Sequence, residues 1–290
     1  MELPLTKEIP TTQDPIQKAR TNWQEFPWWF VGLILVAIAT GYVIITQDNF
    51  REAFGFIKAG VSVTLTTTIF GFMFALVLGL LTGLSRISRS VILRNVATFY
   101  VEFIRGIPML VLIFFIALVA VPAFVTVMNQ IGEWFNTAGL TLLATPFLNI
   151  DIRSVPMNIR AIIALSVTYG AFLAEIFRAG IQSINRGQME AARSQGMSHW
   201  QAMRYVILPQ AIRNVLPALG NDFVSMLKDS SLVSVLAVRD ITQVARLYAG
   251  HSFRYAETYI TLAIIYLTLT VTLSLFVKSL ERRYQNNVQS

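Results

Sequence analysis

Polar and ionisable side chains stand inside long apolar stretches of this sequence, where they are costly unless something compensates them. A charge in the hydrocarbon of a bilayer costs at least about 2.5–3.5 kcal/mol, so it is expected to face a bundle interior, a partner or water. The residues concerned are Glu102, Arg105, Glu175, Arg178, Asn221, Asp222, Lys228, Asp229 and Ser231. Charges placed in this way suit the passage of a polar solute, and we predict that these residues lie along a transport path.

Four of these residues form two oppositely charged pairs. Glu102 and Arg105 are three residues apart, and so are Glu175 and Arg178. Residues at this spacing share one face of a helix, so each pair can partly neutralise itself. Two interpretations stay open for both pairs: a salt bridge that fixes helix packing, or a place in the transport path.

Other kinds of site find no support. His199 and His251 stand alone without metal-ligand spacing, and no phosphate-binding G-x-x-x-x-G-K-[ST] motif, catalytic triad or paired-carboxylate site occurs. The chain has no cysteine, which excludes disulfides and thiolate chemistry. We therefore expect no catalytic residue, no metal and no cofactor in this chain.

The segments that carry these charges are long enough to cross a membrane. The chain is 54% hydrophobic and only 13% charged, and its mean hydropathy is +0.58. About 20 apolar residues in a helix span the hydrocarbon core. Six such runs are present: 28–46, 60–84, 99–122, 159–181, 218–238 and 257–277. The sequence predicts an all-α membrane protein with about six transmembrane helices.

The charge distribution predicts the orientation of these helices. Most lysines and arginines fall in the segments that are cytoplasmic when both termini are inside, which follows the positive-inside rule. The last outer loop, with Arg239, Arg246 and Arg254, fits poorly. The net charge of +7 thus tracks topology and does not indicate nucleic-acid binding. We expect a cytoplasmic tail at 1–27, a retained helix at 28–46 that is not a signal peptide, and a cytoplasmic tail at 281–290.

The insert between the fourth and fifth runs carries the most specific pattern. Glu190-Ala191-Ala192 is followed by Gly196 and by Val206-x-Leu208-Pro209. A glycine that ends one helix and a proline after a second amphipathic run predict a helix–turn–helix, with Gly196 at φ > 0. The pattern resembles the EAA loop of ABC-type importer permeases, the segment that docks on the partner ATPase. The resemblance implies docking roles for Glu190, Ala191, Ala192, Gly196, Trp200, Met203, Leu208 and Pro209.

Three further stretches resemble the polar amino-acid uptake group of these permeases, which import histidine, arginine, lysine, glutamine, glutamate and opines. They are FYVEFIRGIPMLVLIFF at 99–115, YGAFLAEIFRAGIQSINRGQMEAAR at 169–193, and LPQAIRNVLPALGNDF with MLKDSSLVSV within 208–235. The resemblance implies a type I importer transmembrane domain over 56–280, with the EAA loop at 190–209. The helix at 28–46 departs from the five-helix members. For Asn221 and Asp222, near the segment that lines the path in relatives, we favour a ligand-facing role.

The resemblance also implies the partners. An ABC ATPase dimer would use ATP-Mg, a second permease chain would complete the path, and an extracytoplasmic binding protein would deliver a polar amino acid, all at the bacterial inner membrane. The alternative is an ion-coupled secondary transporter, which predicts inverted repeats and broken helices around a midplane site. The sequence leaves open which amino acid is carried and whether the second permease is the same chain.

Overall fold

A computed structural model describes residues 28–286 of the chain, and these residues are almost entirely helical and contain no strand. The predicted tail at 1–27 and the last residues of the tail at 281–290 lie outside this range. The α-helices are α2 (Trp28–Thr46), α3 (Asp48–Ile57), α4 (Val61–Arg86), α5 (Val91–Arg105), α6 (Met109–Phe115), α7 (Val121–Thr137), α8 (Thr141–Leu148), α9 (Met157–Gln182), α10 (Arg186–Ser194), α11 (His199–Ala202), α12 (Leu208–Asp229), α13 (Ile241–Ser252) and α14 (Tyr255–Asn286). Short 3₁₀ segments cover Lys58–Gly60, Ile152–Ser154 and Ser230–Leu236, and π-helical turns cover Ile116–Ala120 and Met203–Ile207.

Helices α4 and α9 form the centre of the bundle, and glycines let their backbones approach closely. A Cβ added to Gly79 would lie 2.7 Å from the Cβ of Leu173, and one added to Gly83 would lie 2.9 Å from the carbonyl oxygen of Ala174. Small residues spaced as G-x-x-x-G permit such contacts between membrane helices. The close approach that the 79–83 spacing allows is therefore formed.

The core around this helix pair draws on several elements. Leu112 and Ile113 of α6, Leu165 of α9 and Met226 of α12 are at most 1% exposed and belong to one buried cluster. Because lipid tails are as apolar as these side chains, van der Waals packing rather than water exclusion stabilises the cluster. The cluster fixes α12 against α4 and α9, so the charged residues of these helices have defined positions.

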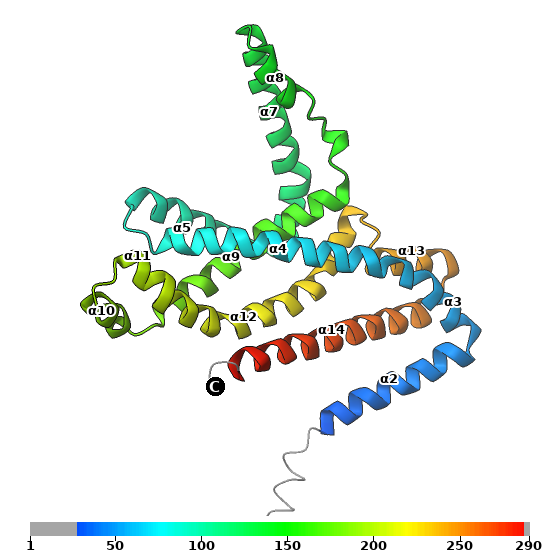
Figure 1. The fold of residues 1–290 in the computed structure, drawn as a ribbon. Coiled ribbons are helices and arrows are strands. Elements are labelled where there is room, and N and C mark those ends of the chain that lie inside the picture. Colours follow the sequence, from blue (N-terminus) through cyan, green and yellow to red (C-terminus); the bar gives the residue numbers. More distant parts are fainter. Residues whose placement is uncertain (1–27, 287–290) are drawn as a thin grey trace, which may run out of the picture.

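The bundle has two distinct ends (Figure 1). Helices α10 and α11 lie at the end of α4 that contains Arg86, and α3 and α13 lie at the opposite end. At that opposite end, Arg254 forms a 2.5 Å ion pair with Glu52. The pair neutralises one of the three arginines that fit the predicted outer loop poorly.

Four of the six predicted runs coincide with helices of the structure, and two do not form single helices over the predicted bounds. The runs at 28–46, 60–84, 159–181 and 257–277 lie in α2, α4, α9 and α14. Among the described residues, the helices apolar and long enough to cross a membrane are Asp48–Arg86, Met109–Thr137, Met157–Gln182 and Tyr255–Arg282, with a shorter apolar helix at Val31–Thr46.

The run at 99–122 is not one helix, because the helix is interrupted between Arg105 and Met109. Pro108 has no N–H to donate to the preceding turn, and its ring disfavours a helical residue before it. The apolar helix therefore starts at Met109 and continues to Thr137. The run at 218–238 is also shifted: α12 begins at Leu208, and the following 3₁₀ segment ends at Leu236, just before Ala237, whose φ is +57°.

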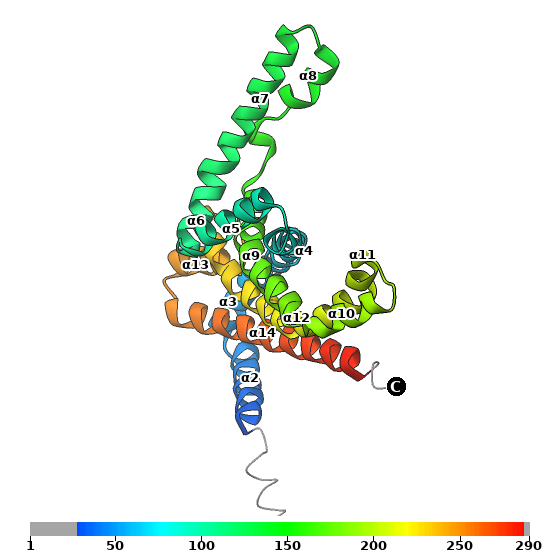
Figure 2. The ribbon, with the colours of Figure 1, turned by 90° about the vertical axis from the view of Figure 1, so that its left-hand side faces the viewer.

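Helices α7 and α8 form an arm that projects away from the bundle (Figures 1 and 2). Gly139 turns the chain between them at φ +78°. The two helices pack on each other through Gly132, where an added Cβ would lie 3.0 Å from Leu148, and through the rings of Phe135 and Phe147, 6.0 Å apart. Residues 121–148 thus form a helical hairpin.

Candidate functional site

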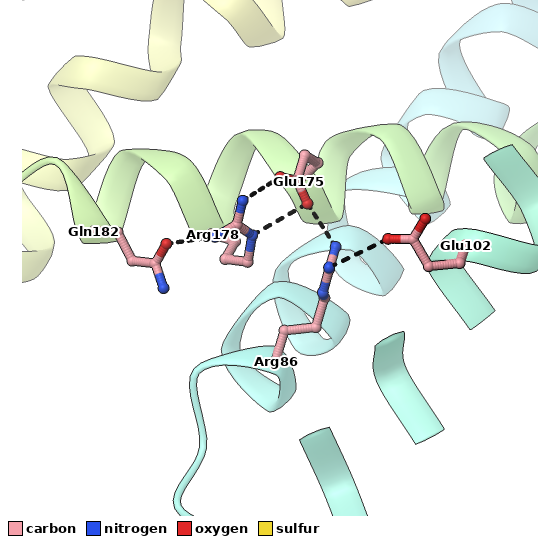
Figure 3. Close-up of polar contacts among 5 residues, drawn as sticks. All are labelled: Arg86, Glu102, Glu175, Arg178 and Gln182. Atoms are coloured by element: carbon pink, nitrogen blue, oxygen red, sulfur yellow. Dashed lines mark hydrogen bonds and ion pairs between the residues drawn. The ribbon is translucent and has the colours of Figure 1, made fainter. Parts of the chain in front are cut away.

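The charged residues of α4, α5 and α9 meet in one network at the end of α4 (Figure 3). The Arg86 side chain, 12% exposed, lies 2.5 Å from an oxygen of Glu175 and 3.5 Å from an oxygen of Glu102. Arg178 donates to both oxygens of Glu175 and also to Gln182. Glu175 therefore accepts hydrogen bonds from two guanidinium groups, a charge-assisted geometry that fixes all three side chains.

The network confirms one predicted pair and not the other. Glu175 pairs with Arg178, one turn away on α9. Glu102 instead pairs with Arg86, while Arg105 lies over the ring of Phe172 with 5.8 Å between the guanidinium carbon and the ring centroid. Glu102 comes from α5, which follows α4 after the turn at 87–90 and lies beside it (Figure 1). Arg86 is a member that sequence reasoning missed.

Helix α12 carries a second polar region, which is arranged differently. Asp222 and Asp229 are seven residues apart, which places them on one face about 10 Å apart along the axis. Asp229 accepts a 2.6 Å hydrogen bond from the hydroxyl of the buried Tyr169, whereas Asp222 has no hydrogen bond or ion pair with any described residue. Sequence reasoning also missed Tyr169, which comes from α9.

The neighbouring face of α12 is polar and exposed. Asn214, Asn221 and Lys228 repeat at intervals of seven residues, and all three are exposed. Only Asn214 has a side-chain partner among the described residues, the hydroxyl of Ser183 at 2.9 Å. Ser231 is half-buried in the 3₁₀ segment that follows α12. We name the line of Asn214, Asn221 and Lys228 with the adjacent Asp222 the α12 polar stripe.

The segment 190–209 folds as a helix, a turn and the start of a second helix, as its pattern predicts, but Pro209 does not end that second helix, which continues from α11 through the π-helical turn into α12. Asn185 caps α10, and Ser198 with Gln201 forms a reciprocal capping box at the start of α11. Between the two helices, Gly196 has φ +84°, which a residue with a side chain adopts only with strain. The predicted conformation of Gly196 is therefore confirmed.

The loop has a buried side and an exposed side. Ala192 is 5% exposed, and Met203 and Ile207 pack with Ile181 of α9 and Ala211 of α12. Ala192 is therefore buried within the chain's own fold and Met203 is half-buried, while their docking roles stay a prediction. This apolar cluster joins the loop to the ends of α9 and α12.

The exposed side carries the remaining coupling candidates. Glu190 and Ala191 are exposed on α10, and Trp200 is 70% exposed on α11. Leu208 and Pro209 begin α12, directly after the π-helical turn Met203–Ile207. The helix–turn–helix thus presents a carboxylate, a small residue and a large aromatic ring on a surface that the rest of the described chain leaves uncovered.

A comparison with protein families identifies this arrangement. Residues 75–286 match the family described as "Binding-protein-dependent transport system inner membrane component". The chain belongs to this family. The matched region contains α5 to α13, the charged network, the α12 polar stripe and the segment 190–209.

Similar proteins agree with the family. The chain is 35% identical over 231 residues to a "Probable amino-acid permease protein YxeN" of Bacillus subtilis, covering 80% of this chain and 92% of the relative. It is 34% identical over 224 residues to the "Glutamine transport system permease protein GlnP" of Escherichia coli, covering 77% and 90%.

Solved structures agree as well. The fold matches the crystal structure of "an amino acid ABC transporter with histidines" with a TM-score of 0.65 and 36% identity, over 83% of this chain and 98% of that one. The prediction of a type I ABC importer permease subunit in a multi-pass membrane protein is confirmed. These matches give no support to the alternative of an ion-coupled secondary transporter.

Proposed function

We propose that this permease subunit forms half of the membrane path of an ATP-driven importer for a polar or charged amino acid. The names of its relatives, which are amino-acid and glutamine permeases, support the substrate class. The complete transporter also contains a second permease chain, an ATPase dimer that hydrolyses ATP-Mg, and an extracytoplasmic binding protein. The observation that carries the proposal is the family match over a chain whose segment 190–209 forms a capped helix–turn–helix with one exposed side.

We propose that the exposed side of this loop docks on the ATPase. Glu190 supplies a carboxylate for a basic or hydrogen-bonding group, Ala191 permits close approach, and Trp200 supplies an apolar anchor of the kind enriched at interfaces. When the ATPase subunits close on ATP, they displace the loop. The displacement passes to α9 and α12 because the buried side of the loop is packed on Ile181 and Ala211.

The same displacement acts on both polar regions. Helix α9 carries Glu175 and Arg178 of the network, and α12 carries the polar stripe. We propose that the stripe faces the translocation path, where Asp222 contacts the substrate or its hydration shell. A polar group in a membrane helix that has no protein partner is stabilised when it faces such a path.

The direct test is uptake by proteoliposomes that contain the permease, its ATPase and its binding protein. We expect amino-acid accumulation that requires ATP on the ATPase side and persists when ionophores collapse the ion gradients. Accumulation that follows an ion gradient without ATP would contradict the proposal.

We further propose that both termini are cytoplasmic. Because the chain contains no cysteine, single cysteines at Pro10, Leu140 and Asn286 can be labelled without background. An impermeant maleimide added outside intact cells should label position 140 and leave positions 10 and 286 unlabelled. Labelling at 10 or 286, or protection at 140, would refute this topology.

A further inference from the structure

A groove of about 570 Å³ lies between the end of α4, the loop and the start of α12. Its walls are apolar: Leu80 and Leu84 come from α4, Met203 from the π-helical turn, and Leu208, Pro209 and Ile212 from α12. Two arginines, Arg204 and Arg213, also line it, and no acidic residue does. The groove therefore combines a lipid-like wall with an excess of two positive charges.

Neither arginine is neutralised within the part of the chain that the structure describes. Arg204 lies over the ring of its neighbour Tyr205, 5.9 Å from the centroid, and neither side chain has an ion pair. Both side chains are exposed. An anionic group that entered the groove would thus meet guanidinium donors that have no competing carboxylate.

The local backbone places the two arginines on one groove. They are nine residues apart, and in a regular α-helix this spacing puts side chains on opposite faces. The π-helical turn Met203–Ile207 intervenes and changes the phase of the helix between them. Turns of this kind are rare and occur frequently at functional sites.

The groove also lies at the depth where a phospholipid headgroup would be. Leu80 and Leu84 belong to the last two turns of the apolar helix that ends at Arg86, and Trp200 stands at the rim of the groove. Tryptophan and arginine are suited to the membrane interface, and basic pockets between transmembrane helices on the cytoplasmic side bind anionic headgroups. The occupant must therefore be both anionic and apolar.

We propose that this groove binds one anionic phospholipid, with the phosphate on Arg204 and Arg213 and an acyl chain along Leu84 and Ile212. The placement of this groove on the cytoplasmic side of the membrane rests on the proposed function and on its proposed topology. Because the groove contacts the loop through Met203 and Leu208, the bound lipid would connect the bilayer to the coupling segment.

The test compares Arg204→Gln/Arg213→Gln with the parent by native mass spectrometry of the purified permease–ATPase complex, with phosphatidylglycerol or phosphatidylcholine added. Arg89→Gln/Arg94→Gln is the matched control. These exposed arginines lie at the same end of the bundle but outside the groove, and replacing them removes the same charge. We expect phosphatidylglycerol retention to fall by about tenfold or more in the groove variant only, since each cation near an anionic headgroup contributes to binding.

Two further measurements separate lipid from other occupants. Leu84→Trp, which fills the apolar wall without altering charge, should also abolish retention, and millimolar inorganic phosphate should not displace the lipid. Equal retention in the two double variants, or displacement by phosphate, would overturn the proposal. Lipid retention can be scored on the permease whether or not the ATPase remains attached, so failure of the proposed function would not be mistaken for failure of this site.

Discussion

The charged network at the end of α4 and the α12 polar stripe contain similar residues, but their charged side chains form ion pairs in the network and, among the described residues, none in the stripe. In the network, Glu175 is held by Arg86 and Arg178, and Glu102 is held by Arg86, so three helices are tied by compensated charges. In the stripe, Asn221, Asp222 and Lys228 have no side-chain partner among the described residues. Compensated charges can hold a structure together, whereas uncompensated ones remain available to a solute or a second chain. The two regions should therefore respond differently to mutation.

The largest effect on stability is expected from Glu175→Gln. The substitution leaves Arg86 and Arg178 facing each other without their shared carboxylate. We expect a loss of about 2–3 kcal/mol in the free energy of unfolding, below the range for fully buried pairs, because the Glu175 and Arg178 side chains are 28% and 29% exposed. Thermal or denaturant unfolding of the purified permease in detergent measures it.

Glu102→Gln is the control for that experiment. It neutralises a glutamate of the same network whose side chain is 65% exposed, so we expect a loss of at most about 1 kcal/mol. Equal losses in the two variants would show that the network is not what ties α4 to α9.

A smaller effect is expected from Tyr169→Phe, which removes the hydroxyl that donates to Asp229. We expect a loss of about 2 kcal/mol, because a buried donor to a carboxylate is worth more than one to a neutral acceptor. Tyr100→Phe is the matched control, since that hydroxyl donates at 2.6 Å to the carbonyl oxygen of Val167 on the same helix, and should cost about 1 kcal/mol. A loss in Tyr100→Phe that equals or exceeds the loss in Tyr169→Phe would contradict the claim that the hydrogen bond to Asp229 is the stronger of the two.

The smallest effect on stability, and the clearest effect on transport, is expected in the stripe. Asp222→Asn and Lys228→Gln should leave assembly with the ATPase intact and unfolding within about 0.5 kcal/mol of the parent. Their ratios of cationic to anionic amino-acid uptake should shift in opposite directions by about three- to tenfold, because they remove opposite charges. Uptake kinetics that stay unchanged for cationic, neutral and anionic amino acids would remove Asp222 from the path.

Residue types and their spacing in the sequence predicted the parts of the site that neighbouring residues determine. The turn at Gly196 and the Glu175–Arg178 pair each depend on residues within one or two helical turns. For such features, spacing and the conformational freedom of glycine decide the outcome.

Features that depend on tertiary contacts were not predictable in the same way. Arg86 reaches Glu175 across 89 positions of sequence, and Tyr169 reaches Asp229 across 60. The packing of Met203 and Ile207 on Ile181 of α9 and Ala211 of α12 likewise joins residues that lie far apart in the sequence or in different elements. The break before Met109 was signalled by Pro108, but the continuous apolar composition on both sides concealed it.

The central claim is that the segment 190–209 couples this permease to ATP hydrolysis. Gly196→Val strains the turn between α10 and α11 by about 1–2 kcal/mol, since Gly196 has φ +84°. Gly139→Val imposes a comparable strain at the tip of the α7–α8 arm, where φ is +78°, and an added Cβ meets no atom within 4 Å at either position. Glu190→Lys reverses the exposed charge without straining the turn.

Substrate-stimulated ATP hydrolysis by the reconstituted complex therefore tests the account most directly. We predict that Gly196→Val and Glu190→Lys insert in the membrane, bind the ATPase weakly and lose most of the stimulation, while Gly139→Val retains it. If Gly196→Val and Glu190→Lys both transport and stimulate hydrolysis like the parent, the docking role of 190–209 is contradicted.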